Sequence, residues 1–218
     1  MKKVVLLAFA MMVAFSGFAQ AMLWDSEVPE KRVTWGVRGG LNVSNIHVSV
    51  DKLGASLDSK VGYRFGVSAD IAIVKSFAIS TGLYYSAKGA KADGGIYDPE
   101  FDEYDTDKLT ISPAYLELPI YASYRVNFAE ASQLQINFGP YLAYGVNGKV
   151  KLGDDKVDVF GDDGFRRFDA GLGVGAGYTF NHFYVGLDYQ FGLANIADTG
   201  GIGKITNRNF NISIGYNF

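Results

Sequence analysis

The sequence contains no cysteine, which excludes disulfide frameworks, thiolate metal sites and cysteine nucleophiles. It has no excess of basic residues either, because 20 Lys and Arg stand against 23 Asp and Glu, a formal net charge of −3. A mildly acidic chain of this kind gives no electrostatic reason to expect a nucleic-acid partner. After the first 21 residues, no stretch is apolar enough to predict a transmembrane helix.

Histidine is scarce, and the two that occur are far apart at His47 and His182. Neither has a serine and a carboxylate on one predicted face, as a catalytic triad requires. The sequence therefore predicts no enzymatic activity and no cofactor. The alternative is an outer-membrane lipase, acylase or protease, which an assay of lipid deacylation with and without His47 would test.

The chain begins with an apparent export signal. Lys2 and Lys3 precede an apolar run over residues 4–18, and residues 19–21 (AQA) fit a small-residue cleavage site. Residues 1–21 are therefore predicted to be a cleaved signal peptide, with cleavage after residue 19 or an uncleaved anchor as alternatives. Residues 22–32 are mixed and polar, and they are predicted to form a short periplasmic leader.

Alternation of apolar and polar residues dominates the rest of the chain. In the last ten residues Phe210, Ile212, Ile214, Tyr216 and Phe218 alternate with Asn, Ser or Gly, which is typical of a strand with one apolar face. Seven earlier segments repeat this period. The eight predicted strands cover residues 33–44, 61–73, 77–87, 114–126, 134–146, 167–180, 183–193 and 209–218.

The connections between these segments alternate in length. Short connections at 74–76, 127–133 and 181–182 alternate with long ones at 45–60, 88–113, 147–166 and 195–208. An even strand number, tight periplasmic turns and long outer loops are typical of outer-membrane barrels. For residues 33–218 we therefore predict an all-β fold, an eight-stranded antiparallel up-and-down transmembrane β-barrel located in the cell outer membrane with periplasmic termini.

The composition of the two strand faces separates a membrane barrel from a soluble one. The apolar faces are rich in bulky aromatic residues, whereas the opposite faces carry charges, Asn and many Gly. The alternate glycines of 171–177 (GLGVGAG) would leave a void in an apolar core, but they make room for long side chains in a polar lumen. We therefore expect apolar faces toward lipid, aromatic girdles at both interfaces, and a bulge or bend near Pro119 and Pro140.

The predicted lumen carries charges of both signs. The charge network is expected to comprise Arg38, Arg64, Asp70, Glu117, Arg125, Arg167, Asp169 and Asp188. The position of each residue along its strand predicts which charges lie at the same level of the barrel. Arg64 and Arg167 are expected near Glu117 and Asp169 towards the outer end. Arg38 is expected level with Asp188, and Arg125 near Asp70 towards the periplasmic end. Unpaired charges are costly in a narrow interior, so we expect a structural plug of paired, lumen-filling side chains. The alternative is a charged pore or binding site.

Two long connections are rich in acidic residues. Carboxylates cluster in 93–107 and 154–163, and clustered carboxylates are ligands for Ca²⁺. Neither run has the EF-hand spacing, and Lys151 and Lys156 lie beside the acids of the second run. The sequence therefore predicts solvated acidic loops at the outer rim rather than a metal site.

Several short motifs resemble those of one family. The stretch 35–44 (WGVRGGLNVS) resembles the first-strand signature of the PorT-like outer-membrane β-barrel proteins of Bacteroidetes-type bacteria. The segments 115–119 (YLELP), 139–141 (GPY), the glycine-rich strand and the ending 215–218 (GYNF) are similar to that family too. The resemblance covers about residues 33–218 and implies an eight-stranded barrel inserted by the outer-membrane assembly machinery. The family is named for a member linked to type IX protein secretion, but no residue here specifies that role.

These features predict an integral outer-membrane protein with a structural or interaction role through its extracellular loops. The alternatives are an accessory component of protein secretion or envelope assembly, and a narrow pore for small solutes. The expected partners are outer-membrane lipid and the barrel-assembly machinery, with other envelope or secretion proteins under the first alternative. Tyr216 and Phe218 at the end of the last strand are predicted to act as the assembly signal.

Overall fold

The computed structural model describes residues 24–50, 53–56, 58–92, 96–98, 103–105, 109–129, 131–152, 155–160, 165–196 and 204–218, so the predicted signal peptide lies outside it. None of the described segments forms a helix long and apolar enough to cross a membrane. The strands are β1 (Val33–Val50), β2 (Leu53–Ser56), β3 (Asp58–Val74), β4 (Phe77–Ala87), β5 (Ala90–Ala92), β6 (Ile96–Asp98), β7 (Glu103–Asp105), β8 (Leu109–Ala129), β9 (Ser132–Leu152), β10 (Asp155–Asp158), β11 (Phe168–Phe180), β12 (Phe183–Gly192) and β13 (Lys204–Asn217).

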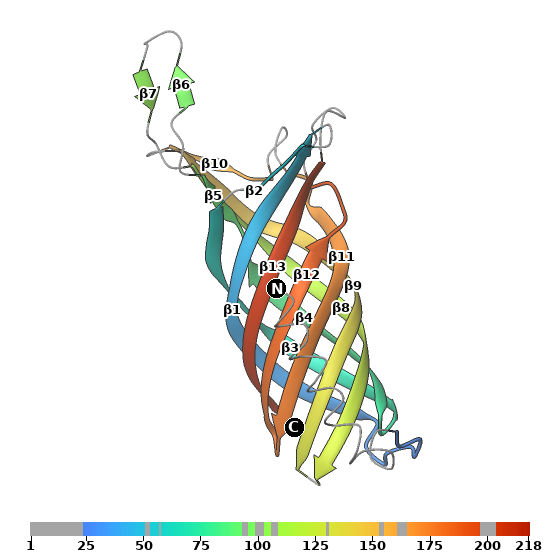
Figure 1. Cartoon of the computed structure of the whole chain (residues 1–218). Coiled ribbons are helices and arrows are strands. Elements are labelled where there is room, and N and C mark those ends of the chain that lie inside the picture. The colour runs from blue at the N-terminus through green and yellow to red at the C-terminus, as the bar shows by residue number, and fades with distance from the viewer. Residues whose placement is uncertain are drawn as a thin grey trace, which may run out of the picture.

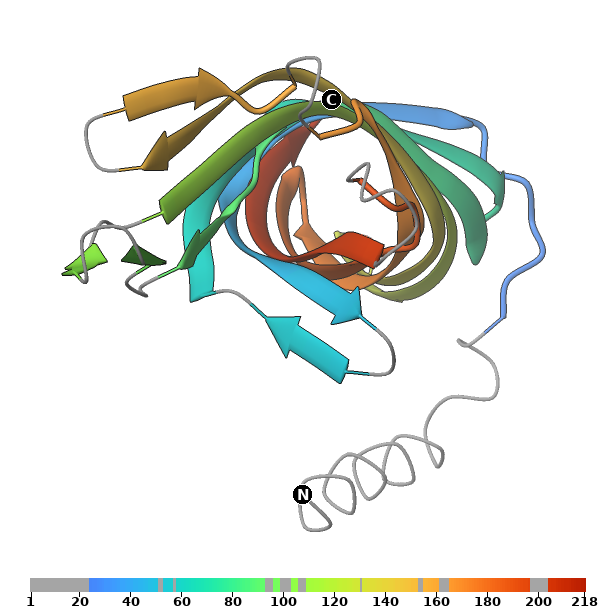
Figure 2. The same cartoon turned by 90° about the horizontal axis from the view of Figure 1, so that it is seen from above.

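The long strands pair in a closed circle. Antiparallel ladders run from β1 to β3, β4, β8, β9, β11, β12 and β13 in turn, and β13 pairs again with β1. Figures 1 and 2 show these strands wrapped around one axis, with β13 beside β1. Closure removes the open sheet edges that would otherwise template aggregation. The prediction of an all-β antiparallel barrel is confirmed.

The two ends of the barrel differ. At the turn end, short connections join β3 to β4, β8 to β9 and β11 to β12. At the other end, here called the loop end, β8 begins at Leu109 and β9 continues to Leu152, well beyond the predicted strands 114–126 and 134–146. The strands β5 and β10 widen this part of the sheet by pairing with β8 and β9 respectively. We call the loop-end parts of β8 and β9, together with β5 and β10, the outer sheet.

The outer sheet corrects the prediction that residues 88–113 and 147–166 are loops. Hydrogen bonding in a β-hairpin continues as long as backbone pairing is possible, and it needs no alternation of apolar residues. The alternation that defined the predicted strands identifies only the part of each strand that has one apolar face. A separate hairpin of β6 and β7 lies above the outer sheet at the loop end (Figure 1).

Side chains divide between the two faces as the alternation predicts. On β1, Leu41 is 60% exposed on the exterior, while the neighbouring Asn42 is 0% exposed in the interior. The same division recurs around the ring, so that exposed Val, Leu, Ile and Phe side chains cover the outside and the buried set is largely polar. A water-soluble barrel would show the reverse arrangement.

Aromatic side chains gather at both ends, as the expected girdles require. At the loop end, Phe65, Tyr85, Tyr144 and Phe168 lie in one line of register neighbours across β3, β4, β8, β9 and β11, interrupted by a leucine on β8. We call this line the aromatic row. At the turn end, the ring of Tyr216 lies 5.5 Å from the rings of both Phe183 and Phe218.

Of the bulge or bend expected near the two strand prolines, the bulge does not occur at Pro119 or Pro140. The register between β8 and β9 is unchanged from Pro119–Tyr141 to Ala122–Phe138, and on the other side of β8 it is unchanged from Thr81–Ile120 onwards. Register shifts occur instead towards the strand ends, between Ala114 and Tyr115 and between Asn127 and Ala129. A missing N–H removes one ladder bond, and the flanking pairs here hold the strands in register without an inserted residue.

The glycines of β11 leave space that tyrosine side chains occupy. A Cβ atom at Gly173 would lie 2.2 Å from the Tyr121 hydroxyl, and one at Gly177 would lie 2.5 Å from the Tyr184 ring. Tyr121 comes from β8 and Tyr184 from β12. The glycines therefore make room for long lumen side chains, as expected.

Candidate functional site

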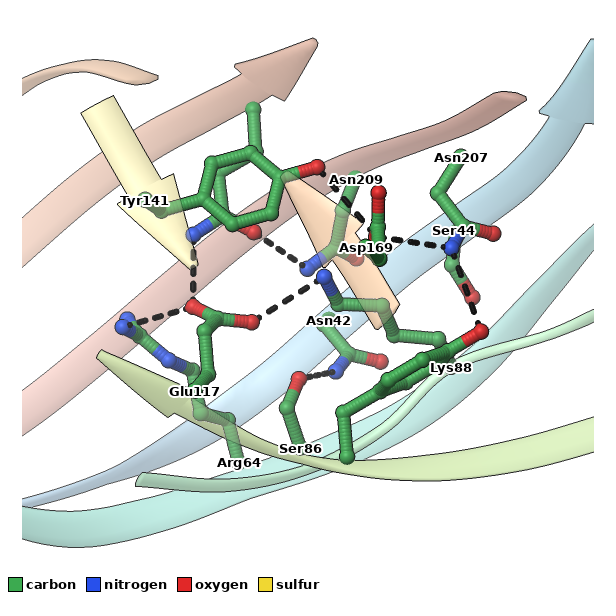
Figure 3. A network of polar contacts seen from close by, with 12 residues as sticks. Asn42, Ser44, Arg64, Ser86, Lys88, Glu117, Tyr141, Asp169, Asn207 and Asn209 are labelled. Carbon is green, nitrogen blue, oxygen red and sulfur yellow. Dashed lines mark hydrogen bonds and ion pairs between the residues drawn. The ribbon is translucent and has the colours of Figure 1, made fainter. Parts of the chain in front are cut away.

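A cluster of buried ion pairs crosses the interior of the barrel (Figure 3). Glu117 on β8 is completely buried, and its carboxylate lies 3.0 Å from Arg64 on β3 and 3.0 Å from Lys88. Arg64 also lies 3.2 Å from Asp188 on β12. The cluster thus joins side chains from separate parts of the ring, and two cations share charge with two carboxylates.

Neutral side chains form hydrogen bonds with both carboxylates of this cluster. Gln190 on β12 donates a 2.6 Å hydrogen bond to the Glu117 carboxylate, while its own carbonyl oxygen accepts from Asn209. Asn211 donates to Asp188. The Arg64 guanidinium also stacks over the Tyr84 ring at 3.9 Å. Desolvated charges are tolerated only with such partners, so this part of the lumen is built to hold its charges in place.

A second buried carboxylate lies closer to the loop end. Asp169 on β11 is 0% exposed and accepts hydrogen bonds from Asn207 at 2.9 Å and from the Tyr141 hydroxyl at 3.4 Å. Beyond it, an apolar cluster that includes Ile46, Tyr115 and Phe160 is packed inside the loop end of the barrel. The interior therefore changes from charged to apolar towards the loop end.

Towards the turn end, the interior is polar again. Arg125 on β8 lies 3.3 Å from Asp70 on β3, and the Ser80 hydroxyl donates to the same carboxylate. Arg38 on β1 donates a 2.6 Å hydrogen bond to the Asn217 side chain, and its guanidinium stacks on the Tyr184 ring at 3.9 Å.

The space left between these side chains is small. A cavity of about 50 Å³ lies between Arg38, Arg64, Asp188 and the tyrosines of the lumen, which is room for a few water molecules. A larger pocket of about 450 Å³ opens at the turn end, where Lys31 and Arg125 are among its lining residues. The small cavity thus lies beside the Arg64–Asp188 ion pair.

The leader contributes to the turn-end pocket. Asp25 exchanges hydrogen bonds with Ser76 in the β3–β4 turn, and the Lys75 amide donates to the Glu27 carbonyl. The Glu27 carboxylate accepts a hydrogen bond from the Lys75 ammonium and raises the pKa of that group. Lys31 donates to the Phe218 carbonyl oxygen. The leader is therefore held at this end of the barrel by contacts with its turns.

The structure brings together part of the predicted charge network. Arg64 meets Glu117, and Arg125 meets Asp70, as the expected heights indicate. Arg38 does not form the expected pair with Asp188, although both line the small cavity. The register places Asp188 opposite Asn211, and Asn211 opposite Asn42 rather than Arg38, so strand stagger separates the two charges.

Arg167 is the second residue of the predicted charge network that does not form its expected ion pair. Its side chain is exposed, donates a 3.0 Å hydrogen bond to the Gly145 carbonyl and lies 5.2 Å from the centre of the Phe160 ring. Among the described residues, no ion pair joins it to Asp169 or to Glu117. Arg167 precedes β11, which begins at Phe168, and contacts the apolar cluster at the loop end instead of the buried carboxylates.

Lys88 is a charged interior residue that the sequence reasoning missed. It was assigned to a long outer loop, yet it is 1% exposed and lies 4.9 Å from the centre of the Tyr141 ring. A signal was present, since the lumen-facing positions Ser80, Tyr84 and Ser86 of β4 extend by one further step of two to residue 88. Figure 3 shows its side chain reaching Glu117 from the connection after β4.

Residues considered for catalysis and metal binding lie apart from this cluster. The His182 imidazole lies 3.0 Å from the Asn217 carbonyl oxygen in the turn end and stacks on Tyr216. Within the described ranges, no group of three or more His, Cys, Asp or Glu side chains is arranged to hold a metal ion. Most of the acidic segments 93–107 and 154–163 lie outside the described residues or have undescribed side chains.

Three comparisons relate the chain to known proteins. Among solved structures, Ail from Yersinia pestis matches with a TM-score of 0.42 and 12% identity, covering 86% of this chain and 100% of that one. OprG from Pseudomonas aeruginosa matches with a TM-score of 0.42 and 12% identity over 89% and 99% of the two chains. Neisserial surface protein A matches with a TM-score of 0.41 and 11% identity, covering 84% of this chain and 97% of that one. A search of curated protein sequences found no match.

A family model extends over most of the sequence. The model described as outer membrane protein beta-barrel domain matches residues 18–198, which include the ion-pair cluster and all but the last strand of the ring. This match agrees with the apolar exterior and the polar interior of the closed ring. The chain therefore belongs to the outer membrane protein beta-barrel domain family and is a protein of the outer membrane.

Proposed function

We propose that this protein is a closed, non-catalytic outer-membrane barrel that acts through the surface of its loop end. The observation that carries the proposal is the buried cluster of Arg64, Lys88, Glu117 and Asp188 inside the ring, beside which the cavity lined by Arg64 and Asp188 has a volume of about 50 Å³. The eight strands of the ring are the membrane-crossing set, and the lumen is filled by side chains. Tyr216 and Phe218 serve as the assembly signal.

In the proposed orientation, the turn end, with the docked leader and Phe218, faces the periplasm and the loop end faces outward. Short turns on the side from which an exported chain arrives support this orientation. The lack of native cysteine allows a direct test. Val157→Cys, at a side chain that is 67% exposed at the loop end, should react with a membrane-impermeant maleimide on intact cells. Glu30→Cys in the leader should react only after permeabilisation, and the reverse pattern would invert the orientation.

The closed lumen has a measurable consequence for conductance. Planar bilayers that contain the purified, folded protein should show no large and stable single-channel conductance, because a solute would have to displace paired buried charges. A porin of known conductance in the same bilayers is the control. Stable openings of the wild-type protein would contradict the plug and favour the alternative, a narrow pore for small solutes.

An accessory role in secretion or envelope assembly is the second candidate. It is supported by the exposed side chains of Trp24 and Val28 on the docked leader, which are 60% and 48% exposed at the proposed periplasmic end. The PorT-like assignment rests on the short motifs alone. Crosslinking in cells through the leader, compared with crosslinking through the loop end, distinguishes periplasmic envelope partners from extracellular ones.

A further inference from the structure

The outer sheet carries a row of lysines on one face. Ile111 and Val150 are register neighbours on β8 and β9 and face the buried apolar cluster. Side chains alternate along a strand, so the adjacent pairs Thr110–Lys151 and Ser112–Lys149 face the exterior. Two neighbouring strands add to this face: Lys91 on β5 lies opposite Thr110, and Lys156 on β10 lies opposite Lys151.

A fifth lysine reaches the same face from β3. The Lys60 ammonium donates a 2.5 Å hydrogen bond to the Ser112 hydroxyl. We call this group the lysine face; its members are Lys60, Lys91, Lys149, Lys151 and Lys156.

Among the side chains that the structure describes, no ion pair relieves the repulsion on the lysine face. Lys151 and Lys156 stand directly opposite each other on adjacent strands, an arrangement that is destabilising for like charges. The ion pairs of the described residues involve Arg64, Lys75, Lys88 and Arg125, and none of them includes a member of the lysine face. Asp58 and Asp158 are opposite Lys91 and Lys149 in register without forming such a pair.

The position of the lysine face relates it to the membrane surface. It continues the lipid-facing exterior of β8 and β9 beyond the aromatic row, and Lys149 follows Tyr144 by about 16 Å along the strand. With the usual strand tilt, this places Lys149 about 12 Å above the row, at headgroup level. Figure 2 shows β10 and the end of β9 leaning away from the barrel axis, so the outer sheet extends over the surrounding lipid.

We propose that the lysine face binds the phosphate groups of anionic glycolipids in the outer leaflet. Ammonium groups pair with phosphates as point charges, and phosphates at headgroup level would neutralise the repulsion between Lys151 and Lys156. Continuity with the lipid-facing surface selects a membrane lipid over a soluble anion. The proposal rests on the outward orientation of the loop end.

Retention of a defined glycolipid tests the proposal. The full protein is reconstituted into phosphatidylcholine nanodiscs doped with lipid A carrying both phosphates, or with dephosphorylated lipid A, and the co-purified lipid is counted by native mass spectrometry after mild extraction. Lys151→Gln/Lys156→Gln should reduce retention of the phosphorylated form about tenfold or more. The matched control Lys204→Gln/Arg208→Gln removes two exposed cations of β13 and should retain the lipid like wild type. A high-salt wash should release it.

Each outcome bears on the lysine face alone, because maleimide labelling of Val157→Cys tests the orientation separately. Equal retention by Lys151→Gln/Lys156→Gln and wild type would overturn the proposal, as would equal retention of dephosphorylated lipid A. Displacement of lipid A by inorganic phosphate at the same concentration would overturn the assignment to a membrane lipid. Both double variants replace exposed side chains, and their folding is verified by the gel shift between unboiled and boiled samples.

Discussion

Glu117→Gln is expected to lower the free energy of unfolding by about 3 kcal/mol or more. Gln has nearly the same shape as Glu, so the loss reports the removed charge rather than a cavity. The variant leaves Lys88, which is fully buried, without its carboxylate partner, and it deprives Arg64 of one of its two. Unfolding in urea, followed by tryptophan fluorescence and gel shift of the protein in lipid vesicles, measures the change.

A double variant separates the ion pair from a general loss of packing. Lys88→Met/Glu117→Gln removes both the carboxylate and the buried ammonium that would otherwise lack a partner, so it should be more stable than Glu117→Gln alone. Glu30→Gln, at an exposed leader position, should unfold like wild type. Additive losses from Lys88→Met and Glu117→Gln would show that the two side chains do not stabilise each other.

Gly40→Val is expected to prevent closure of the barrel. A Cβ atom at Gly40 would lie 2.0 Å from the Ile212 carbonyl oxygen and 2.8 Å from the Ser213 Cα atom, both backbone atoms of β13. Backbone at the closing seam cannot move aside without breaking the β1–β13 ladder, so the cost should be about 3 kcal/mol or more. The fraction of protein that shows the folded gel shift after refolding into vesicles measures the effect.

The adjacent residue supplies the control. A Cβ atom at Gly39 would meet nothing within 4 Å, and this position faces the exterior. Gly39→Val makes the same chemical change one residue away, and Val is favoured in strands, so this variant should fold as well as wild type. Equal folding of both variants would mean that the seam is looser than the close contact indicates.

Much of the barrel followed from the sequence alone. Alternation predicted which side chains face outward, because the period of a strand is a local property of the backbone. It correctly placed Leu41 outside and Asn42 inside, and the alternate glycines of β11 correctly indicated space for long lumen side chains, one of which is Tyr121. The extended strands of the outer sheet escaped prediction because a hairpin there continues without an apolar face.

The candidate site was only partly predictable. Arg64, Glu117 and the Arg125–Asp70 pair were assigned to the lumen and found together there. Lys88 was missed because the predicted strand was taken to end at residue 87, one residue short of it. Arg167 was assigned to the charge network because of its expected height, but its guanidinium contacts the Phe160 ring and the Gly145 carbonyl rather than a carboxylate.

The sequence by itself determined that this protein is an all-β chain with apolar outer faces and a charged interior. Only the tertiary structure decided which charges meet. Pairing of Arg64 with Asp188, rather than of Arg38 with Asp188, depends on the stagger between strands that lie far apart in the chain. The lysine face has the same origin: Lys151 and Lys156 adjoin an acidic run in the sequence, and the register of β9 with β10 places them opposite each other. Stagger and register are set by closure of the whole ring, and the local alternation of apolar and polar residues does not determine them.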